Sequence, residues 1–415
     1  MKKEIIILAL MIFSSIFFIT PNIEWDEYVY LMNAKHFAGQ SIYFENIRPP
    51  MLSLITSIFY SLGIESIIFP AVPLIIFAFF LLSLYLFSKD SKALILMFSF
   101  PIFLMYIQKL MTSILGASFV LLSLFFLKEY FSKKKDLFFY SSFFFSGMAF
   151  LSRYPLGINL ASISILYIVF SNKKDWSKLP KGFAAFMLPI IPWVMHIGAG
   201  SFITAFTLVS SFTHFPESLN FFHYFYGIIP IFGISIASLL FFKNYKYKKN
   251  DLFFIIPLAL IFAAFQLISN KEDRYLIPLL PFCAIFFSGI MKKSRHFILM
   301  AIIFFSFSIL YSRSFYGSLC STKNNLLEFN DFFKEKENTA ILSNFWPICS
   351  YYSNNPCFAV ISNYDFSQRI IETNASYIAV SSFCPNFDLN EYSNYEIIKT
   401  ISADSCETIN IYAIE

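Results

Sequence analysis

"SIIFPAVPLIIFAFFLLSLYLF" (residues 66–87) contains no charged residue and is long enough, as a helix, to cross the hydrocarbon core of a bilayer. The whole chain shares this character, because 57% of its 415 residues are hydrophobic and only 14% are charged. In ordinary soluble domains, about a quarter of all residues are charged. The composition therefore excludes a soluble globular protein and predicts a polytopic helical membrane protein.

Apolar runs of similar length recur along the first three quarters of the chain and predict about eleven transmembrane helices. They lie near 4–20, 66–87, 93–107, 112–127, 137–152, 155–171, 183–199, 223–242, 252–268, 276–291 and 297–311. The stretch 93–127 is divided at Gln108 and Lys109 because it is too long for one crossing. We therefore predict a transmembrane bundle over residues 1–312, with a long loop at 21–65.

Lysine and arginine are concentrated in alternate loops, such as "KEYFSKKKD" (128–136) and "KNYKYKKND" (243–251). Because basic loops stay on the cytoplasmic side, this pattern predicts a cytoplasmic N-terminus and an extracytoplasmic loop 21–65. The same loops account for the net charge of +5, since basic clusters beside crossings anchor topology near anionic lipid. We expect the bilayer, and no nucleic acid, as a partner. The first apolar run lacks a small-residue cleavage site, so we expect a retained anchor.

The last hundred residues differ from the rest and predict a small extracytoplasmic α/β domain over 313–415. Strand-like runs alternate there with polar or helical stretches. The runs are "TAILSN" (339–344), "CFAVIS" (357–362), "SYIAVSS" (376–382), "YEIIKTI" (395–401) and "INIYAI" (409–414). The sequence of this region matches no domain that we can name.

Five of the six cysteines lie in this C-terminal region, namely Cys320, Cys349, Cys357, Cys384 and Cys406. Their spacing fits no tight metal motif, and cysteines outside the cytoplasm commonly form disulfides. We predict the pairs Cys349–Cys357 and Cys384–Cys406, which leaves Cys320 over. The sixth cysteine, Cys283, sits inside an apolar run.

The predicted crossings contain almost no ionisable side chains, although transporters keep such residues on their pathways. No nucleotide-binding loop is present either. The chemistry is therefore expected in the outer loops, where three polar stretches stand out. They are the loop 21–65, "LSRYPLG" (151–157) and "NKEDRYLIPLLP" (270–281).

The loop 21–65 predicts two helices. If 25–38 is helical, Trp25, Tyr28, Val29 and Met32 form one apolar face. Asp26 and Glu27 then point about 100° apart and need separate roles. After "RPP", residues 51–62 form an apolar helix too short to span a bilayer, which is expected in the interface or against the bundle.

Each polar stretch also has a simpler explanation. Asp26 and Glu27 can cap a helix or mark a solvated boundary. Arg48, Arg153 and Arg274, taken singly, can reach lipid headgroups from the ends of helices. The histidines are scattered without the spacing of metal ligands, which argues against a helical zinc motif.

In order and sidedness, these stretches resemble the GT-C superfamily of membrane glycosyltransferases, especially the protein O-mannosyltransferase and lipid A aminoarabinose transferase branch. The resemblance is carried by "WDEYVYLMNAKHFAGQ" (25–40), "ENIRPPMLSLITSIFYSLG" (45–63), "FLSRYPLG" (150–157) and "NKEDRYLIPLLP" (270–281). Members show an Asp-Glu pair in the first outer loop, an Arg/Lys-Pro-Pro-Leu element and a late Arg-Tyr-Leu-x-Pro stretch. Met51 replaces the usual leucine. The resemblance covers roughly residues 1–290.

The resemblance implies an inverting transfer from a polyprenyl-phosphate sugar. Such a displacement needs one carboxylate to take the proton of the acceptor hydroxyl, and Asp26 fits this role. Glu27 is expected to orient a cation or to contact the acceptor. The acceptor is a lipid, a glycan or a protein, and the sequence does not choose between them.

The leaving phosphate needs cations, and the resemblance implies Arg48 and Arg274 for this role, with Lys271 or Arg153 in support. No cofactor is predicted. A divalent metal is left open, because relatives use one, but no second acidic pair completes a metal site in the sequence.

Two other functions are also compatible with the sequence. A transporter of a lipid-linked glycan predicts cations along a path across the membrane, whereas here they gather at one face. A non-catalytic scaffold predicts that Asp26 can be replaced without effect.

Overall fold

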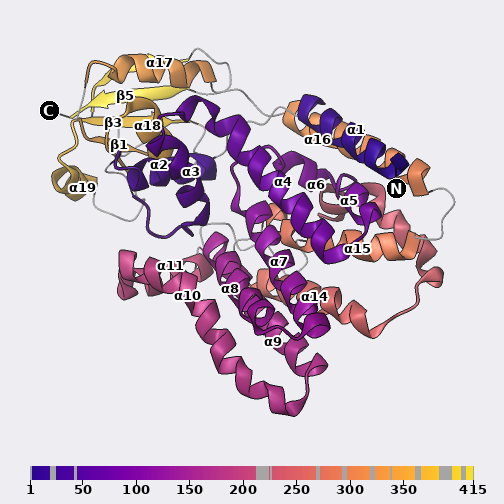
Figure 1. The fold of residues 1–415 in the computed structure, drawn as a ribbon. Coiled ribbons are helices and arrows are strands. Elements are labelled where there is room, and N and C mark those ends of the chain that lie inside the picture. Colours follow the sequence, from indigo (N-terminus) through magenta and orange to yellow (C-terminus); the bar gives the residue numbers. More distant parts are fainter. Residues whose placement is uncertain are drawn as a thin grey trace. The chain divides into compact units, whose positions relative to one another are not determined.

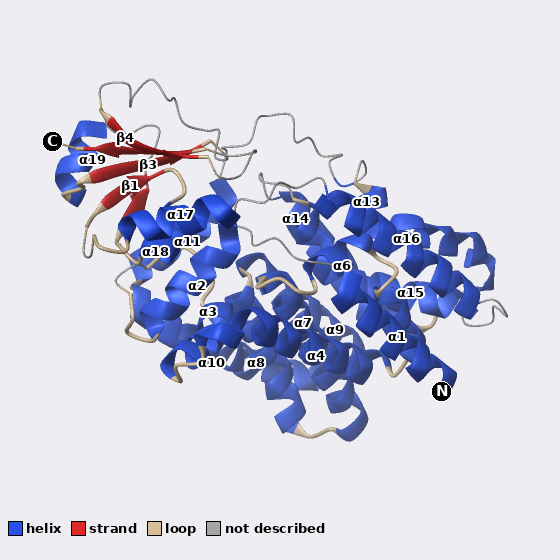
Figure 2. Cartoon of the chain, turned by 90° about the horizontal axis from the view of Figure 1, so that it is seen from above, coloured by secondary structure: helices blue, strands red, loops and turns tan. Residues whose placement is uncertain are grey.

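The computed structural model describes residues 2–18, 25–41, 44–211, 224, 227–267, 272–291, 297–317, 323–336, 339–359, 366–382, 395–402 and 408–414. The chain is mostly helical and carries one five-stranded sheet near its C-terminus (Figures 1 and 2). It divides into two compact units. Met1–Pro21, Asn46–Leu52 and Ser66–Tyr316 form the first unit, and Asn22–Glu45, Ser53–Glu65 and Gly317–Glu415 form the second.

The first unit is a helical bundle. Its α-helices are α1 (Lys2–Phe18), α4 (Ile68–Ser88), α5 (Ser91–Met97), α6 (Pro101–Tyr106), α7 (Thr112–Lys133), α8 (Asp136–Ser152), α9 (Asn159–Phe170), α10 (Leu179–Ile197), α11 (Ala199–Ser211), α13 (Ile228–Phe232), α14 (Leu252–Leu267), α15 (Leu280–Met291) and α16 (Phe297–Gly317). Short 3₁₀ helices are η1 (Glu65–Ile67), η2 (Tyr154–Ile158), η3 (Lys173–Lys178), η4 (Gly233–Asn244), η5 (Lys249–Asp251) and η6 (Asp273–Leu279).

Within the described residues, five helices are long and apolar enough to cross a membrane. They are Glu65–Ser88, Thr112–Lys133, Lys249–Leu267, Asp273–Met291 and Phe297–Ser314. Asp175–Ile197 and Ala199–Ala205, separated by a bend of 106°, make a sixth if they count as one span. Four shorter apolar helices lie elsewhere in the described chain. The chain is thus an integral membrane protein, while the number of eleven crossings stays a prediction.

Two of the predicted crossings are interrupted by residues that break helices. The run 93–107 forms α5 and α6 instead of one helix, because Phe100 is extended (ψ 114°) as a residue before proline prefers, and Pro101 opens a new helix. The run 223–242 changes from α13 to the 3₁₀ helix η4 at Gly233, whose φ is 57°.

Helices α7, α8 and α10 pack closely in the bundle. A Cβ atom on Gly147 of α8 would meet the backbone oxygen of Phe186 of α10 at 2.3 Å, so the two helices approach at a position where only glycine fits. Buried Asn159 of α9 donates to the hydroxyls of Ser123 on α7 and Ser146 on α8, at 2.7 and 3.1 Å. Small residues and interhelical hydrogen bonds of this kind hold helices together in membranes.

The second unit contains the sheet, and all five predicted strands are present. They are β1 (Ile341–Ser343), β2 (Cys357–Ala359), β3 (Tyr377–Ser381), β4 (Ile397–Ile401) and β5 (Ile409–Ala413). The order is β2-β1-β3-β5-β4. The pairs β2–β1 and β1–β3 are parallel, whereas β3–β5 and β5–β4 are antiparallel.

Alternation along the strands gives the sheet two apolar faces. Ile341 of β1 packs with α17 (Lys323–Phe333) and α18 (Trp346–Ser353), whereas its neighbour Leu342 belongs to the opposite cluster. Ile370 of α19 (Phe366–Thr373) packs against that opposite cluster. The C-terminal module is therefore a helix–sheet–helix sandwich, as expected for a small α/β domain.

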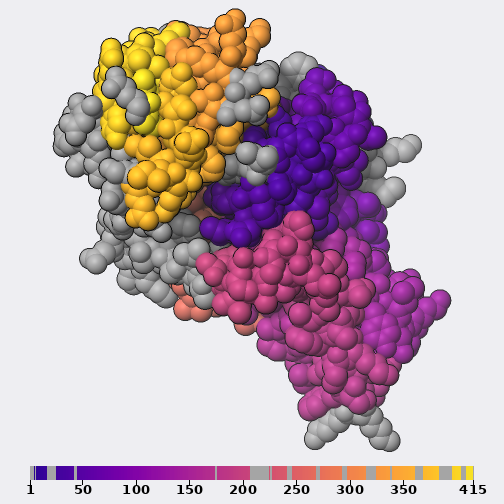
Figure 3. Space-filling model, turned by 90° about the vertical axis from the view of Figure 1, so that its left-hand side faces the viewer, coloured from indigo at the N-terminus to yellow at the C-terminus, as the bar shows by residue number. Residues whose placement is uncertain are grey.

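Most of the loop 21–65 belongs to the second unit. It forms α2 (Trp25–Phe37) and α3 (Met51–Ser61). Trp25 packs against the cluster formed by α17, α18 and the sheet, and in the space-filling view indigo residues adjoin gold residues of the C-terminal segment (Figure 3). The predicted division into residues 1–312 and 313–415 stays a prediction, but α2 packs with the C-terminal module.

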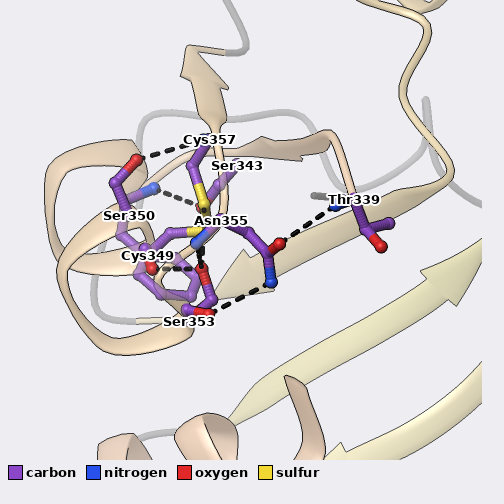
Figure 4. The surroundings of a disulfide bond; sticks show 8 residues. Thr339, Ser343, Cys349, Ser350, Ser353, Asn355 and Cys357 are labelled. Atoms are coloured by element: carbon purple, nitrogen blue, oxygen red, sulfur yellow. Dashed lines mark hydrogen bonds between the residues drawn. A yellow bond between two sulfur atoms is a disulfide. The ribbon is translucent and has the colours of Figure 1, made fainter. Parts of the chain in front are cut away.

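The predicted Cys349–Cys357 disulfide is confirmed (Figure 4). It joins α18 to strand β2, and the Cys357 N–H also donates to Ser350 Oγ at 3.0 Å. The side chain of Asn355, which lies between α18 and β2 in the sequence, accepts a hydrogen bond from the Thr339 N–H at 3.0 Å. Strand β2 is thus fastened to α18 covalently and by hydrogen bonds.

The other cysteine predictions have different outcomes. Cys320, Cys384 and Cys406 lie outside the described residues, so the pair Cys384–Cys406 stays a prediction. Cys283 of α15 is not in a disulfide.

Candidate active site

Helix α2 carries both predicted carboxylates in its first turn, where negative charge complements the helix dipole. Asp26 is half-buried, whereas Glu27 is only 2% exposed. The predicted apolar residues Tyr28, Val29 and Met32 are buried, but the helix is buried on its other sides as well, because every residue from Glu27 to Ala34 is buried. Elements of the second unit surround the helix: α18 covers one side, and Ser53 of α3 donates to the Tyr30 carbonyl at 3.0 Å.

An aromatic group joins α2 to α18. The rings of Trp25 and Trp346 meet edge to face, with centroids 4.7 Å apart. The hydroxyls of Tyr28 and Tyr352 lie 3.1 Å apart. Rings in this arrangement add stabilisation beyond the burial of their area. The residue directly before Asp26 is therefore anchored on the C-terminal module.

Lys35 lies at the other end of α2 with its ammonium 4.9 Å from the ring centre of Tyr351 and 5.8 Å from that of Tyr60. Burial lowers the pKa of Lys35, and nearby Glu65 partly opposes this effect. The aromatic faces offset some of the desolvation of the cation. Lys35 thus holds α2 against α3 and α18.

Titration of Tyr351 is expected to destabilise the second unit at high pH. Burial raises the pKa of Tyr351 from 10.0 to about 12, and Tyr352 and Glu65 act in the same direction. Between these two pH values the folded unit keeps a proton that the unfolded chain has lost, so stability present below pH 10 is lost as the pH rises toward 12. The absorbance of phenolate, compared between wild type and Tyr351→Phe, measures this ionisation. A Tyr351 phenolate that forms near pH 10 would contradict the assignment.

Arg48 lies in a turn just before α3 and is half-buried, and the two prolines that follow it are buried. This part of the loop, Asn46–Leu52, belongs to the first unit. Lys271 lies outside the described residues.

Arg153 directly follows the last residue of α8, and two sets of contacts fix its side chain. The guanidinium donates to Ser113 Oγ in the first turn of α7. Its central carbon lies 4.1 Å above the ring centre of Tyr275 and 5.5 Å from that of Phe265 on α14. A guanidinium stacked on aromatic rings keeps donors available at its edge.

Arg274 lies one residue away from Tyr275 in η6 and is also fixed. Its Nε forms an ion pair with Glu272, and Nη1 lies 3.8 Å from the sulfur of Met111, just before α7. The Tyr275 hydroxyl donates to the same Glu272 carboxylate at 3.2 Å.

These contacts bring Arg153 and Arg274 together. Tyr275 carries the guanidinium of Arg153 on its ring and shares Glu272 with Arg274. We call Arg153, Arg274, Glu272 and Tyr275 the arginine cluster. It lies where the N-terminal end of α7, the C-terminal end of α8 and the start of η6 meet. The carboxylates of Glu272 and Asp273 lie in the same region, because both act electrostatically on Tyr224 together with Arg153. The two guanidinium groups can bind an anion such as phosphate.

Sequence reasoning used Lys109 to divide two crossings and to assign the orientation, but gave it no role in the site. Lys109 lies in the short connection between α6 and α7, two residues before Met111, and is only 3% exposed. Its ammonium lies 4.9 Å from the ring centre of Tyr106. A charged residue buried in a membrane bundle is costly and commonly functional, and this rule could have selected it.

The two groups of site residues belong to different units. Asp26 and Glu27 are in the second unit, whereas Arg48, Arg153 and Arg274 are in the first. Within the described residues, no group of three His, Cys, Asp or Glu side chains is close enough to hold a metal ion.

Part of the chain matches a known protein family. Residues 47–196 match the family model of dolichyl-phosphate-mannose-protein mannosyltransferases, a range that includes Arg48 and Arg153. A search of curated proteins finds no match. The resemblance to the GT-C superfamily, predicted from the sequence, is confirmed.

Among solved structures, the chain is similar to ArnT from Cupriavidus metallidurans in the apo state, with a TM-score of 0.70 and 11% sequence identity. That similarity covers 98% of this chain and 97% of ArnT. ArnT from the same organism bound to undecaprenyl phosphate gives a TM-score of 0.66 at 11% identity, over the same shares of the two chains. The chain has the fold of these proteins.

Proposed function

We propose that the chain is an inverting glycosyltransferase that moves a sugar from a polyprenyl phosphate to an acceptor hydroxyl. The family model that matches it describes sugar transfer from a lipid phosphate. A protein of the same fold was solved with undecaprenyl phosphate bound. The observation that carries the proposal is the arginine cluster, in which Tyr275 and Glu272 hold two guanidinium groups at one end of the bundle.

The arginine cluster would bind the phosphate of the donor. In the transfer, the bond between the anomeric carbon and the phosphate oxygen breaks, and the electron pair leaves with the polyprenyl phosphate. Guanidinium groups stabilise that growing negative charge, and because Tyr275 and Glu272 already position them, little reorganisation is needed. Arg48 and Lys271 are proposed as further cations for the same phosphate.

Asp26 is proposed as the general base. The acceptor oxygen attacks the anomeric carbon from the side opposite the phosphate, and its proton passes to the Asp26 carboxylate. A single displacement of this kind inverts the anomeric configuration and needs no second carboxylate as nucleophile. Glu27 is only 2% exposed, which favours a positioning role over direct contact with the acceptor.

The proposed reaction takes place on the extracytoplasmic side. The basic loops support this orientation because they follow the positive-inside pattern, with the N-terminus in the cytoplasm. Arg153 follows the C-terminal end of α8, and Met111, which contacts Arg274, precedes the N-terminal end of α7. The cluster therefore lies at the ends of α7 and α8 opposite the basic connection between them, residues 133–136.

Binding of the donor lipid tests the proposal directly. Undecaprenyl phosphate is expected to bind the purified chain about 10- to 150-fold more tightly than undecaprenol, because charge-assisted hydrogen bonds contribute roughly 1.5–3 kcal/mol. The two lipids have the same tail, so competition between them in nanodiscs isolates the phosphate. Equal affinity for both lipids would overturn the proposed phosphate site.

A further inference from the structure

The second unit contains a hollow beside the disulfide. It has a volume of about 260 Å³ and is lined by Phe44, Glu45, Trp346, Pro356, Cys357, Phe358 and Ala359. All of these residues belong to the second unit. Phe44 and Glu45 come from the loop 21–65, Trp346 begins α18, and Pro356 directly precedes strand β2, which supplies the other three.

Each wall of this hollow is held in place. The side chain of Asn33 on α2 forms two hydrogen bonds with the backbone of Glu45. It donates to the carbonyl at 2.9 Å and accepts from the N–H at 2.8 Å. Phe44 stacks on His36 of α2, with ring centroids 4.6 Å apart. The opposite wall is fixed because the Cys349–Cys357 disulfide ties β2 to the helix that begins with Trp346. The hollow is therefore a preformed site, as binding pockets usually are.

Size and chemistry limit what this hollow can hold. Pockets for small molecules usually measure about 300–1,000 Å³, so a hollow of about 260 Å³ suits a single ring more than a long chain. The lining includes three aromatic residues, Trp346, Phe44 and Phe358. Among the described residues that line the hollow, Glu45 is the only one with a formal charge. A carboxylate accepts hydrogen bonds from hydroxyls and repels phosphate.

The hollow is linked to the proposed base through helix α2. Trp346 meets Trp25 edge to face at 4.7 Å, and Asp26 is the next residue along α2. Asn33, which fixes Glu45, belongs to the same helix. One helix thus connects the wall of the hollow to the carboxylate that would take the acceptor proton.

We propose that this hollow binds an uncharged sugar ring of the acceptor, so that the acceptor is a carbohydrate. The inference rests on the proposed function and deepens it, because it selects a glycan or a sugar-bearing lipid over a protein. Trp346 and Phe44 stack on the ring, and Glu45 accepts from its hydroxyls.

Binding of simple glycosides by the full-length protein tests the inference without requiring transfer. The probes are methyl α-D-mannopyranoside and methyl β-D-glucopyranoside, followed by saturation-transfer NMR on protein in nanodiscs. Both Ala359→Phe and Glu45→Gln are expected to weaken glycoside binding. Ala359→Phe occupies the space of the ring, and Glu45→Gln costs about tenfold or more, the loss typical of a hydrogen bond to a charged group. Glu45→Gln keeps the backbone bonds to Asn33, so it stays informative if Ala359→Phe does not fold.

Two control variants match these changes. Ile398→Phe adds an aromatic ring to β4, the strand at the opposite edge of the sheet, at a residue that is 41% exposed. Glu372→Gln removes a carboxylate from α19 of the same unit. Both are expected to bind the glycosides like wild type, and intact Cys349–Cys357 in non-reducing digests shows that each variant has folded.

Loss of glycoside binding in the two hollow variants and not in the controls supports the inference. Unchanged binding in the hollow variants would overturn it, as would absence of glycoside binding in a wild-type protein that binds undecaprenyl phosphate. If a neutral serine- and threonine-containing peptide binds instead, and Ala359→Phe abolishes that binding, the hollow is a peptide site and the inference is wrong. Wild-type protein that does not bind undecaprenyl phosphate would reject the proposed donor. If the same protein binds glycosides and Ala359→Phe weakens that binding, the hollow remains a sugar site.

Discussion

Asp26→Asn is expected to reduce sugar transfer by about a hundredfold or more, since a positioned general base typically contributes 10²–10⁴-fold. The asparagine amide has nearly the same shape as the carboxylate but cannot take the acceptor proton. The measurement is transfer of radiolabelled sugar from a panel of polyprenyl-phosphate donors, with wild type and variant at equal abundance in matched membranes.

Asp331→Asn is the control for this experiment. Asp331 is an exposed carboxylate on α17, in the same unit as Asp26, and its replacement is expected to leave transfer unchanged. Equal transfer by wild type and Asp26→Asn would remove Asp26 from the mechanism. A transporter or a non-catalytic scaffold instead predicts no transfer by either protein.

Arg274→Ala is expected to lower the rate of the chemical step by about 10²–10³, the usual cost of removing one preorganised donor from a developing negative charge. The substitution also removes the guanidinium partner of Glu272, while the hydrogen bond from the Tyr275 hydroxyl remains. The site becomes more negative as a result. Arg274→Lys keeps the charge but not the planar fork of donors, so a partial loss is expected. Single-turnover transfer at saturating donor measures the chemical step separately from donor binding.

The chain offers a matched control for this substitution. Arg369 and Glu372 form a comparable pair on α19, with the charged atoms 3.3 Å apart on an exposed surface. Such pairs contribute about 0–1 kcal/mol, so Arg369→Ala is expected to preserve transfer. If Arg274→Ala behaves like Arg369→Ala, the arginine cluster has no part in phosphate stabilisation.

Local sequence signals predicted much of the fold. Charge-free apolar runs predicted the helices of the bundle, because a bilayer admits few alternatives. The five strands followed from short β-rich runs, and Ile341 and Leu342 face opposite sides of the sheet as alternation requires. The Cys349–Cys357 pair was predictable from its short separation of 8 residues. Pro101, inside the run 93–107, was a visible signal for the break between α5 and α6 that the prediction did not use.

Contacts between distant segments could not be predicted in this way. Periodicity placed Trp25 on an apolar face, but it does not report that Trp346 forms the partner surface. It likewise gave no sign that the ring of Tyr275 lies under the guanidinium of Arg153. Both arginines stood out in polar stretches between apolar runs, and the family resemblance implied a role for them, whereas their pairing needed three dimensions. The sequence thus proposed a set of candidate residues, and the structure adds the contacts between Arg153, Tyr275 and Arg274.

The contact between α2 and α18 has a consequence for biosynthesis. Tyr28 and its partner Tyr352 are separated by 324 positions, so the ribosome must add all the intervening residues before the contact can form. At roughly 5–20 residues per second this takes on the order of 15 to 65 s. During that interval α2 lacks the surface that buries Trp25 and Tyr28. A nascent chain that stops before residue 346 would therefore present these rings to chaperones or lipid, and the segment that carries Asp26 would be among the last parts of the protein to mature.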